Sequence, residues 1–386
     1  MSKAAKNMSL SATFALVLAN VWLAAGYETV YVSRHCARST PMTVYGGPSD
    51  YNYMDNFSSI PFPSWGVDTY LCLPRGTKIV ETFGKNLRKA GFPTPFKTTS
   101  DTAQRDKTTA KALLTGLGLP VDYDVQPSLF NPTETGLCKA LPMQEQIEAM
   151  TETFNEIFKD PSAVKEHQQR LANIQKVMGK GAAPPMQTFK ETITAGTWGG
   201  TYSGGAAVAN CVTEAFLMQN GGGIEMAWGK LDVDTLYGDF LKAHILYRHV
   251  MCRTKKVAQH RHSNMLKAIL DALVDTGSKG TRMFVGHDGD LDGLAAILGL
   301  SWHATPYPIN STTPNSGLRF DVYEENGKKN IRINVYYTTF ETDDAPVMVV
   351  PANFSSTSTN TMPWNDFQQF AEGEMDMSCV EKRKHL

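Results

Sequence analysis

Hydrophobic and polar residues alternate along the chain with two different periods. Residues 28–33 alternate one by one and are rich in β-branched side chains, which predicts a strand. Residues 77–90 repeat apolar side chains with helical spacing, and Gly91 and Pro93 follow as stop signals. A short strand over 96–99 and a second helix come next. This succession of strands and helices is typical of an α/β sheet.

Between residues 142 and 275 the pattern changes to long, polar-rich helical repeats. The helices predicted there cover residues 144–158, 162–178, 204–220, 233–252 and 256–275. The sheet pattern resumes at 282–285 and continues with a helix, a hairpin over 318–337 and a strand over 347–350. We therefore expect an α/β fold, in which a doubly wound mixed sheet domain (27–141 and 276–386) carries an inserted, mainly helical subdomain (142–275).

The first 26 residues have the pattern of a secretory signal peptide. Lys3 and Lys6 precede an apolar stretch over 12–22, and small residues at 24–26 offer a cleavage site. The apolar stretch is shorter than the roughly 20 residues that a membrane-spanning helix needs, and we expect no membrane span after its removal. The expected location is secreted or extracytoplasmic, in a periplasm, a lumen or the extracellular space.

The overall charge argues against nucleic acid or an anionic membrane as a partner. The chain has 37 Lys and Arg against 38 Asp and Glu, a formal net charge of −1. Removal of residues 1–26 takes two lysines, and 35 − 38 leaves a charge near −3. Such a chain has no general attraction for polyanions, so any anion must be bound by a local cluster of positive charge.

The cysteines and glycosylation sequons agree with export. Six cysteines are present, and N-glycosylation sequons begin at Asn56, Asn310 and Asn353. Cys36 is either free or bridged to Cys72, and Cys211 and Cys252 either pair or remain buried thiols. No spacing of cysteines and histidines indicates zinc, and we expect neither a metal nor a cofactor.

Two apolar strands run directly into charged residues. The first strand leads into Arg34, His35 and Arg38, and the strand that resumes the sheet leads into His287 and Asp288. Open α/β sheets bind ligands beyond the carboxyl ends of their strands, at the point where the strand order reverses. Both groups of residues would therefore face one crevice if the two strands are neighbours.

These residue types suit the transfer of a phosphoryl group. Arg34 and Arg38 could neutralise a phosphate monoester and orient its oxygens, with His287 as a further donor. A neutral His35 could attack phosphorus and form a covalent intermediate. Asp288 could protonate the leaving alkoxide and then activate water. An acidic pH optimum is expected because Asp288 must carry a proton when the ester bond breaks.

The same residues carry a resemblance to the histidine acid phosphatases. The run from Arg34 to Arg38 resembles the family signature Arg-His-Gly-x-Arg-x-Pro, and Gly286-His-Asp288 resembles its His-Asp motif. Asp101-x-x-Gln-Arg105 is similar to the helix start that supplies a third phosphate-binding arginine. Further similar segments lie at 73–76, 317–321 and 130–138, the last as in bacterial phytases of this family, and the resemblance spans most of 27–150, 200–300 and 313–380.

The resemblance implies a role for each matched residue. His35 would be the nucleophile and Asp288 the proton donor. The implied phosphate-binding side chains are Arg34, Arg38, Arg105 and His287. The residues expected at the pocket rim are Thr40, Glu225 and His244. A disulfide between Cys138 and Cys379 is also implied, and the partners would be small-molecule phosphate esters.

The chain also departs from the family signature. Cys36 stands in place of a glycine, and the motif proline comes one position late, at Pro41. Residues 42–43 lack the lysine of related phytases, and Gly289-Asp290 replaces a hydroxyl residue and an asparagine. Because a cation is lost and an anion is added near the mouth, we expect a singly phosphorylated substrate to be favoured over a hexakisphosphate.

The sequence therefore predicts a secreted acid phosphatase that forms a phosphohistidine. The alternatives are a phytase-type inositol phosphate hydrolase, a phosphoryl transferase or mutase, and a catalytically impaired protein that binds phosphate esters. His249, His260 and His262, which have basic neighbours, are interpreted as part of a solvated helix face.

Overall fold

The structure is a computed structural model that describes residues 28–94, 96–196, 199–274 and 280–382. The predicted signal peptide lies outside the described residues. Within those ranges, no helix combines the length and the apolar character that crossing a membrane requires.

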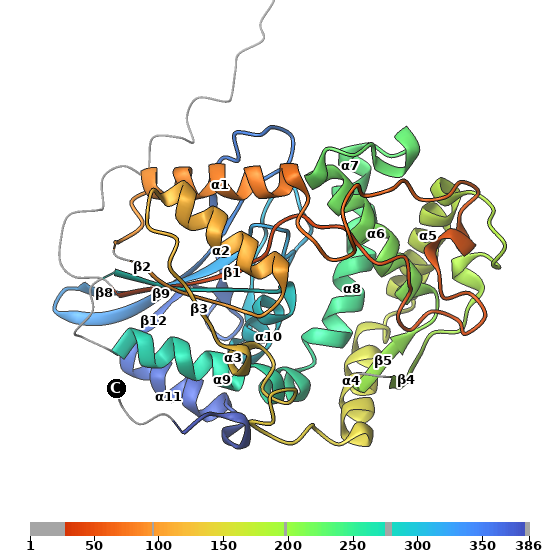
Figure 1. Cartoon of the computed structure of the whole chain (residues 1–386). Coiled ribbons are helices and arrows are strands. Elements are labelled where there is room, and N and C mark those ends of the chain that lie inside the picture. The colour runs from red at the N-terminus through yellow and green to blue at the C-terminus, as the bar shows by residue number, and fades with distance from the viewer. Residues whose placement is uncertain (1–27, 95, 197–198, 275–279, 383–386) are drawn as a thin grey trace, which may run out of the picture.

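A mixed sheet forms the centre of one half of the molecule (Figure 1). Its strands are β1 (Glu28–Arg34), β2 (Phe96–Ser100), β3 (Asp124–Val125), β6 (Gly280–Gly286), β8 (Gly317–Glu325), β9 (Lys328–Tyr337), β10 (Met348–Pro351) and β12 (Thr361–Pro363). Among the described residues the order is β10-β9-β8-β1-β6-β2-β3, with β12 paired to β9. β1, β6, β2 and β3 are parallel, whereas β8, β9, β10 and β12 pair antiparallel.

Helices cover both faces of this sheet, as the doubly wound fold requires (Figure 1). They are α1 (Pro74–Lys89) and α2 (Gln104–Leu117) on one face, and α9 (Lys255–Val274), α10 (Asp288–Leu298) and α11 (Trp364–Glu374) on the other. Val30, Tyr31 and Val32 of β1 are all buried, because helices cover the sheet on both sides. The predicted α/β class with a mixed sheet is confirmed.

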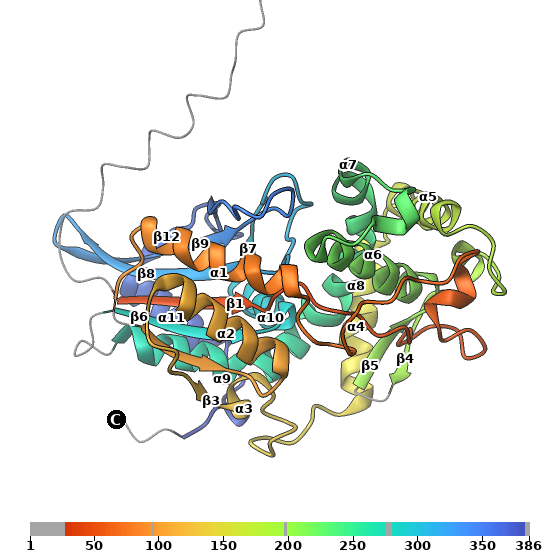
Figure 2. The same ribbon diagram turned by 45° about the horizontal axis from the view of Figure 1, so that its top comes forward.

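A second group of helices gathers beside the carboxyl edge of the parallel strands (Figures 1 and 2). They are α4 (Met143–Ile157), α5 (Pro161–Met178), α6 (Gly205–Gly222), α7 (Val233–Thr235) with the π-helical turn η4 (Leu236–Phe240), and α8 (Leu241–Cys252). A hairpin of β4 (Thr192–Gly196) and β5 (Gly199–Ser203) lies among them. This hairpin was not predicted, because its two strands have five residues each and β4 buries none of its residues.

The helix α9 packs differently from the predicted division of the chain. That division placed it in the helical subdomain, but α9 contacts β1 and α10 and lies against the sheet. Its buried residues include Met265, Leu266 and Ile269. The division itself stays a prediction, and the packing of α9 favours an end of the helical part before Lys255.

Short elements complete the described chain. They are η1 (Met54–Phe57), α3 (Pro127–Phe130), η2 (Met186–Thr188), η3 (Met226–Gly229), β7 (Leu300–Ser301), β11 (Asn353–Phe354) and η5 (Met377–Cys379).

Two disulfides link segments that are distant in the sequence. Cys138 is bonded to Cys379, as the family resemblance implied. Cys36 is bonded to Cys72, so of the two alternatives for Cys36 the free thiol was wrong. The Cys36 side chain turns toward Cys72, which explains how a side chain replaces the glycine of the signature. Cys211 and Cys252 are free thiols.

Candidate active site

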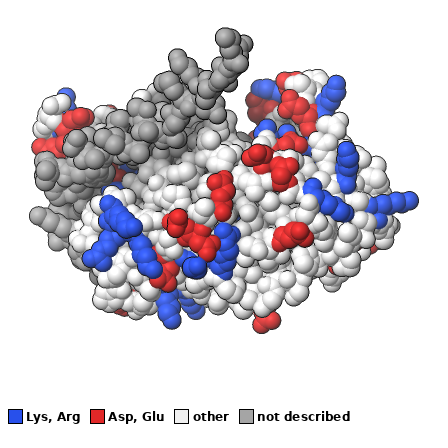
Figure 3. Space-filling model, turned by 90° about the horizontal axis from the view of Figure 1, so that it is seen from above, with Lys and Arg blue, Asp and Glu red and all other residues white. Residues whose placement is uncertain are grey.

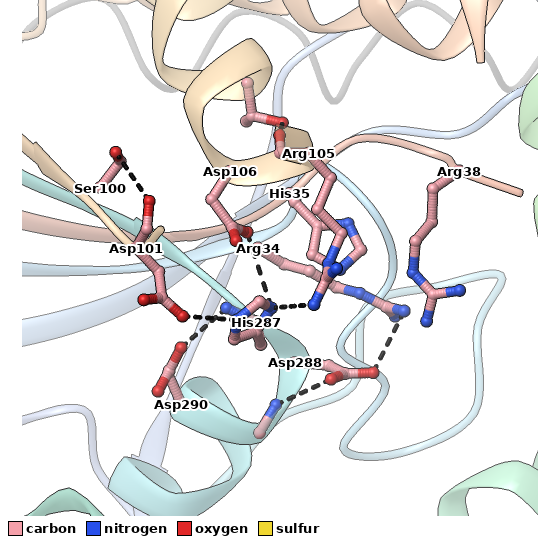
Figure 4. A network of polar contacts seen from close by, with 12 residues as sticks. Arg34, His35, Arg38, Ser100, Asp101, Arg105, Asp106, His287, Asp288 and Asp290 are labelled. Atoms are coloured by element: carbon pink, nitrogen blue, oxygen red, sulfur yellow. Dashed lines mark hydrogen bonds and ion pairs between the residues drawn. The ribbon is translucent and has the colours of Figure 1, made fainter. Parts of the chain in front are cut away.

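The two charged motifs lie side by side because their strands are neighbours. β1 and β6 pair in parallel register with Arg34 opposite Gly286, and the backbone amide of His35 donates to the Gly286 carbonyl at 2.9 Å. A side chain at Gly286 would collide with the Asp290 carboxylate and the Phe130 ring, so this close approach needs glycine. The arginines, histidines and carboxylates meet at the carboxyl edge of the sheet (Figure 4).

His35 is held as a neutral imidazole in one tautomer. Its Nδ1 lies 2.8 Å from the carbonyl oxygen of Cys36, which can only accept, so Nδ1 carries the proton. The lone pair is therefore on Nε2. Burial, together with the nearby positive charge of Arg34, Arg38 and Arg105, holds the pKa of His35 well below its usual value. The ring is thus prepared to act as a nucleophile.

A partly buried glutamate joins two of the arginines. One carboxylate oxygen of Glu214, on α6, accepts from Nη2 of Arg34 at 2.9 Å and from Nη2 of Arg38 at 3.2 Å. Arg34 is fully buried and also donates to the carbonyl of Thr312. Burial by itself raises the pKa of Glu214, but Arg38 and Arg34 outweigh this and lower it. The two guanidiniums are therefore fixed relative to each other by an anion.

Arg105 completes the arginine group from the start of α2. Its Nη2 lies 3.4 Å from Nδ1 of His287. The ring of Tyr70 lies over the guanidinium carbons of both Arg38 and Arg105, at 5.2 and 5.5 Å from the ring centroid. Tyr70 has a φ of 68°, which is costly for a residue with a side chain. The sequence analysis did not single out Tyr70.

His287 lies between two carboxylates. Its Nε2 is 2.9 Å from Asp101 Oδ2, and its Nδ1 is 3.6 Å from Asp106 Oδ1 (Figure 4). Burial opposes a charge on the imidazole, but Asp101 and Asp106 outweigh burial, and the pKa of His287 is raised. As the N-cap of α10, His287 also donates its backbone amide to Asp290 Oδ2 at 2.7 Å. The ring is thus held as a charged donor.

Asp288 lies between two guanidiniums. Its Oδ2 is 3.1 Å from Arg34 Nη2 and 2.9 Å from Arg248 Nη1, and its Oδ1 accepts from the amide of Gly289 at 2.9 Å. Burial works to raise the pKa of Asp288, but Arg248 and Arg34 hold it well below its usual value. In the free protein Asp288 is therefore a carboxylate.

Asp106 is a fully buried carboxylate of the site. Neither of its oxygens accepts a hydrogen bond from any residue that the structure describes, and its nearest charged partner is His287. Burial raises the pKa of Asp106 to about 6, against the attraction of His287 and Arg105.

The three residues expected at the rim take different positions. Thr40 and His244 are both buried, so neither side chain is exposed at a surface rim, and their roles stay predictions. His244 bonds Asn210 at 2.8 Å through Nδ1, and burial lowers the pKa of His244 to about 4. Glu225 is exposed, immediately before the turn η3.

The sequence analysis missed Glu214, Arg248 and Asp106, which carry no motif of their own. It also misjudged two histidines that it assigned to a solvated face. His260 and His262 are buried, and His262 lies 3.4 Å from Asp290 behind the His-Asp motif. The spacing of these histidines along the sequence gives no sign of the contact with Asp290, because the contact depends on how α9 packs against α10.

Two groups of ligand atoms in the described residues lie within 4.8 Å of one another. They are Cys138-His260-Cys379 and His35-Asp106-His287. The sulfurs of the first group are joined in a disulfide. The second group shares its space with the Arg105 guanidinium, which opposes a cation and favours an anion.

The face seen in Figure 3 shows no comparable cluster of positive charge among the described residues. On the face shown in Figure 3, basic and acidic side chains are interspersed with uncharged ones. Arg34 and Arg38 are instead buried at the edge of the sheet. An anion would therefore be recognised by the buried cluster itself, as the near-neutral composition led us to expect.

Known proteins provide an independent comparison. No protein-family model matches the chain. In sequence it is similar to phytase AppA of Escherichia coli (strain K12), with 22% identity over an alignment of 335 residues; the match covers 76% of this chain and 76% of that protein.

The fold is similar to those of solved bacterial phytases. The phytase of Citrobacter braakii has a TM-score of 0.80 and 21% identity, with 92% of this chain and 100% of that chain covered. A Hafnia alvei phytase in complex with myo-inositol hexakis sulphate has a TM-score of 0.80 and 21% identity, with 93% and 100% covered. A Klebsiella sp. ASR1 phytase has a TM-score of 0.79 and 16% identity, with 94% and 98% covered. The resemblance of this chain to the histidine acid phosphatases, the family of these bacterial phytases, is thereby confirmed.

Proposed function

We propose that this chain hydrolyses phosphate monoesters through a phosphohistidine formed on His35. The observation that carries the proposal is the state of His35. It is neutral, its free lone pair is on Nε2, and the guanidiniums of Arg34, Arg38 and Arg105 surround it. A neutral nucleophile beside concentrated positive charge is what attack on an anionic phosphate requires.

The first half of the reaction transfers the phosphoryl group to the protein. Arg34, Arg38, Arg105 and the His287 imidazolium bind the phosphate oxygens and offset their charge. The Nε2 lone pair of His35 attacks phosphorus, and the bond from phosphorus to the ester oxygen breaks. Asp288 gives its proton to the departing alkoxide, which leaves as an alcohol.

The second half releases phosphate. The Asp288 carboxylate takes a proton from water as the water oxygen attacks the phosphohistidine. The bond from phosphorus to Nε2 breaks, inorganic phosphate leaves, and His35 is neutral again. Asp288 ends the cycle protonated, as the first half requires.

Bound substrate changes the charge around Asp288. In the free protein Arg34 and Arg248 keep it ionised. A phosphate dianion that takes the donors of Arg34 brings negative charge to this position, which raises the affinity of Asp288 for a proton. Protonation of the donor is thus coupled to substrate binding, and an acidic optimum follows because protons must be available.

We further propose inositol phosphates as the substrate class. The departures from the signature favoured a simpler monoester, but the relatives and solved structures described above are phytases, and one of them holds an inositol hexakis sulphate. The comparisons thus support the phytase-type alternative over the broad acid phosphatase. A higher kcat/KM for myo-inositol hexakisphosphate than for glucose 1-phosphate is expected, and the reverse order would exclude this class as the preferred one.

Trapping the covalent intermediate tests the mechanism. Acid-labile label on His35 is expected when the enzyme is mixed with a radiolabelled phosphate ester and quenched in base, where phosphohistidine survives. His35→Ala should lose label and at least about 10⁴-fold of kcat. Phosphate binding without turnover in the unaltered protein would instead favour the impaired binding protein, and transfer that depends on an added acceptor would favour a transferase.

The predicted export remains part of the proposal. An exported enzyme would act on a small phosphate ester outside the cytoplasm. Determination of the amino terminus of the protein recovered from its producing cells tests this, with cleavage near residue 26 as the expected result.

A further inference from the structure

Arg248 reaches the proposed proton donor from a different part of the chain. It projects from α8, and its Nη1 lies 2.9 Å from Asp288 Oδ2. Arg34 Nη2 is 3.1 Å from the same oxygen. Arg248 belongs to none of the sequence motifs described above, whereas Arg34 does.

A second carboxylate holds Arg248 in place. Its Nε lies 2.6 Å from Oδ2 of Asp292, which follows Asp288 by one turn of α10 and is buried. Arg248 therefore spans two carboxylates on one helix face, and its own side chain is only 13% exposed. This double contact fixes the guanidinium against the Asp288 carboxyl.

We infer that Arg248 is a positioning residue that sets the pH range in which Asp288 can protonate a leaving group. The inference rests on the proposed function, because it takes Asp288 as the proton donor. Arg34 must turn its donors to the phosphate when an ester binds. Arg248 has no such competing partner in the mechanism, so it remains the cation bound to Asp288 during bond cleavage.

Other charged groups also face Asp288. From β1 and the segment after it come Arg34 and His35, and from α8 come His244 and Arg248. Glu214 on α6 is the opposing anion, and Arg105 on α2 is a more distant cation. His244 and His35 are kept neutral by burial, so Arg248 is the charge on the helical side that favours the carboxylate form of Asp288.

The consequence depends on the leaving group. An alkoxide is a poor leaving group and needs the proton of Asp288, whereas 4-nitrophenolate leaves without one. Removing the charge of Arg248 lets Asp288 keep its proton at higher pH. The falling limb of the pH profile should then move upward for an alkyl ester and much less for an aryl ester.

The test compares kcat against pH for glycerol 2-phosphate and 4-nitrophenyl phosphate. For Arg248→Met the falling limb on glycerol 2-phosphate should rise by about 1 to 3 pH units. Arg248→Lys, which keeps the charge, should restore the original limb. Arg253→Met is the matched control, because Arg253 is a partly buried arginine just after α8 that contacts the Leu300 carbonyl and the Trp302 ring. Its limb should stay in place.

Each outcome decides one point. An unmoved limb in folded Arg248→Met, or an equal shift in Arg253→Met, would overturn the role of Arg248 while leaving the phosphohistidine intact. Substantial turnover by His35→Ala would overturn the proposed function instead. If Arg248→Met does not fold, as judged by thermal unfolding, Arg248→Gln removes the charge with less loss of polar contact and gives the same reading.

Discussion

His287 and Asp288 are consecutive in the sequence, but their side chains lie in environments of opposite charge. On the sheet side, the segment after β2 and the start of α2 bring Asp101 and Asp106 to His287. On the helical side, α8 brings Arg248 to Asp288. One step along the backbone therefore passes from an anionic to a cationic environment.

This contrast shows how neighbours in sequence acquire different chemistry. The carboxylates raise the pKa of His287 against the effect of burial, so that it stays a charged donor. The guanidiniums lower the pKa of Asp288, also against burial, so that it stays ionised until an anion arrives. The protonation state of each residue is determined by the charged side chains that it faces, which for Asp288 include Arg34 from β1 as well as Arg248 from α8.

Of the substitutions considered, the loss of Arg34 should have the largest effect on stability and activity. Arg34→Met leaves the partly buried carboxylates of Glu214 and Asp288 with one neighbouring cation fewer. We expect a loss of about 3–5 kcal/mol in the free energy of unfolding and of about 10³-fold or more in kcat/KM. Urea unfolding and steady-state kinetics measure the two effects.

A control separates stability from chemistry. Arg319 on β8 is also fully buried and paired with a carboxylate, Asp321, but takes no part in the site. Arg319→Met should lose stability while its folded fraction keeps kcat/KM. Equal loss of kcat/KM in both variants would contradict a specific role for Arg34.

The anionic side is tested by Asp106→Asn. The pKa of Asp106 is about 6 in the folded protein, above the value of about 3.9 expected for the unfolded chain. The folded state therefore binds more protons between these values, and its stability falls as pH rises from about 4 to about 6. Asp106→Asn lacks this loss. Its stability relative to the original protein should grow by about 2–3 kcal/mol between pH 4 and pH 7.5.

Urea unfolding at both pH values measures this difference. A difference in stability that stays constant across the range would show that Asp106 does not titrate in it.

The smallest of the expected effects is that of Glu214→Gln on the affinity for inorganic phosphate. The Glu214 oxygen occupies Nη2 of both Arg34 and Arg38, donors that a phosphate group also requires. Neutralising this competing anion should lower the inhibition constant of inorganic phosphate about tenfold. Glu191→Gln is the control, since Glu191 is a partly buried partner of His167 and Tyr202 in the helical part. A higher inhibition constant for Glu214→Gln would contradict competition.

Local patterns account for much of the fold and for the centre of the site. The helical face of α1 and the strands β1, β6, β8 and β9 follow from their own periodicity, which tertiary contacts did not override. Arg34, His35 and Asp288 could be identified because each stands at a strand end within a short motif. The hairpin of β4 and β5 could not, because its strands have only five residues each and β4 buries none of its residues.

The sequence by itself determined which side chains stand at the carboxyl ends of β1 and β6, since strand and motif are continuous there. Only the tertiary structure decided their charges. Arg248, Glu214 and Asp106 come from three separate helices and bear on His287 and Asp288 through space. A pKa depends on burial and on charges within a few ångströms, and neither quantity is encoded in the spacing of residues along one segment.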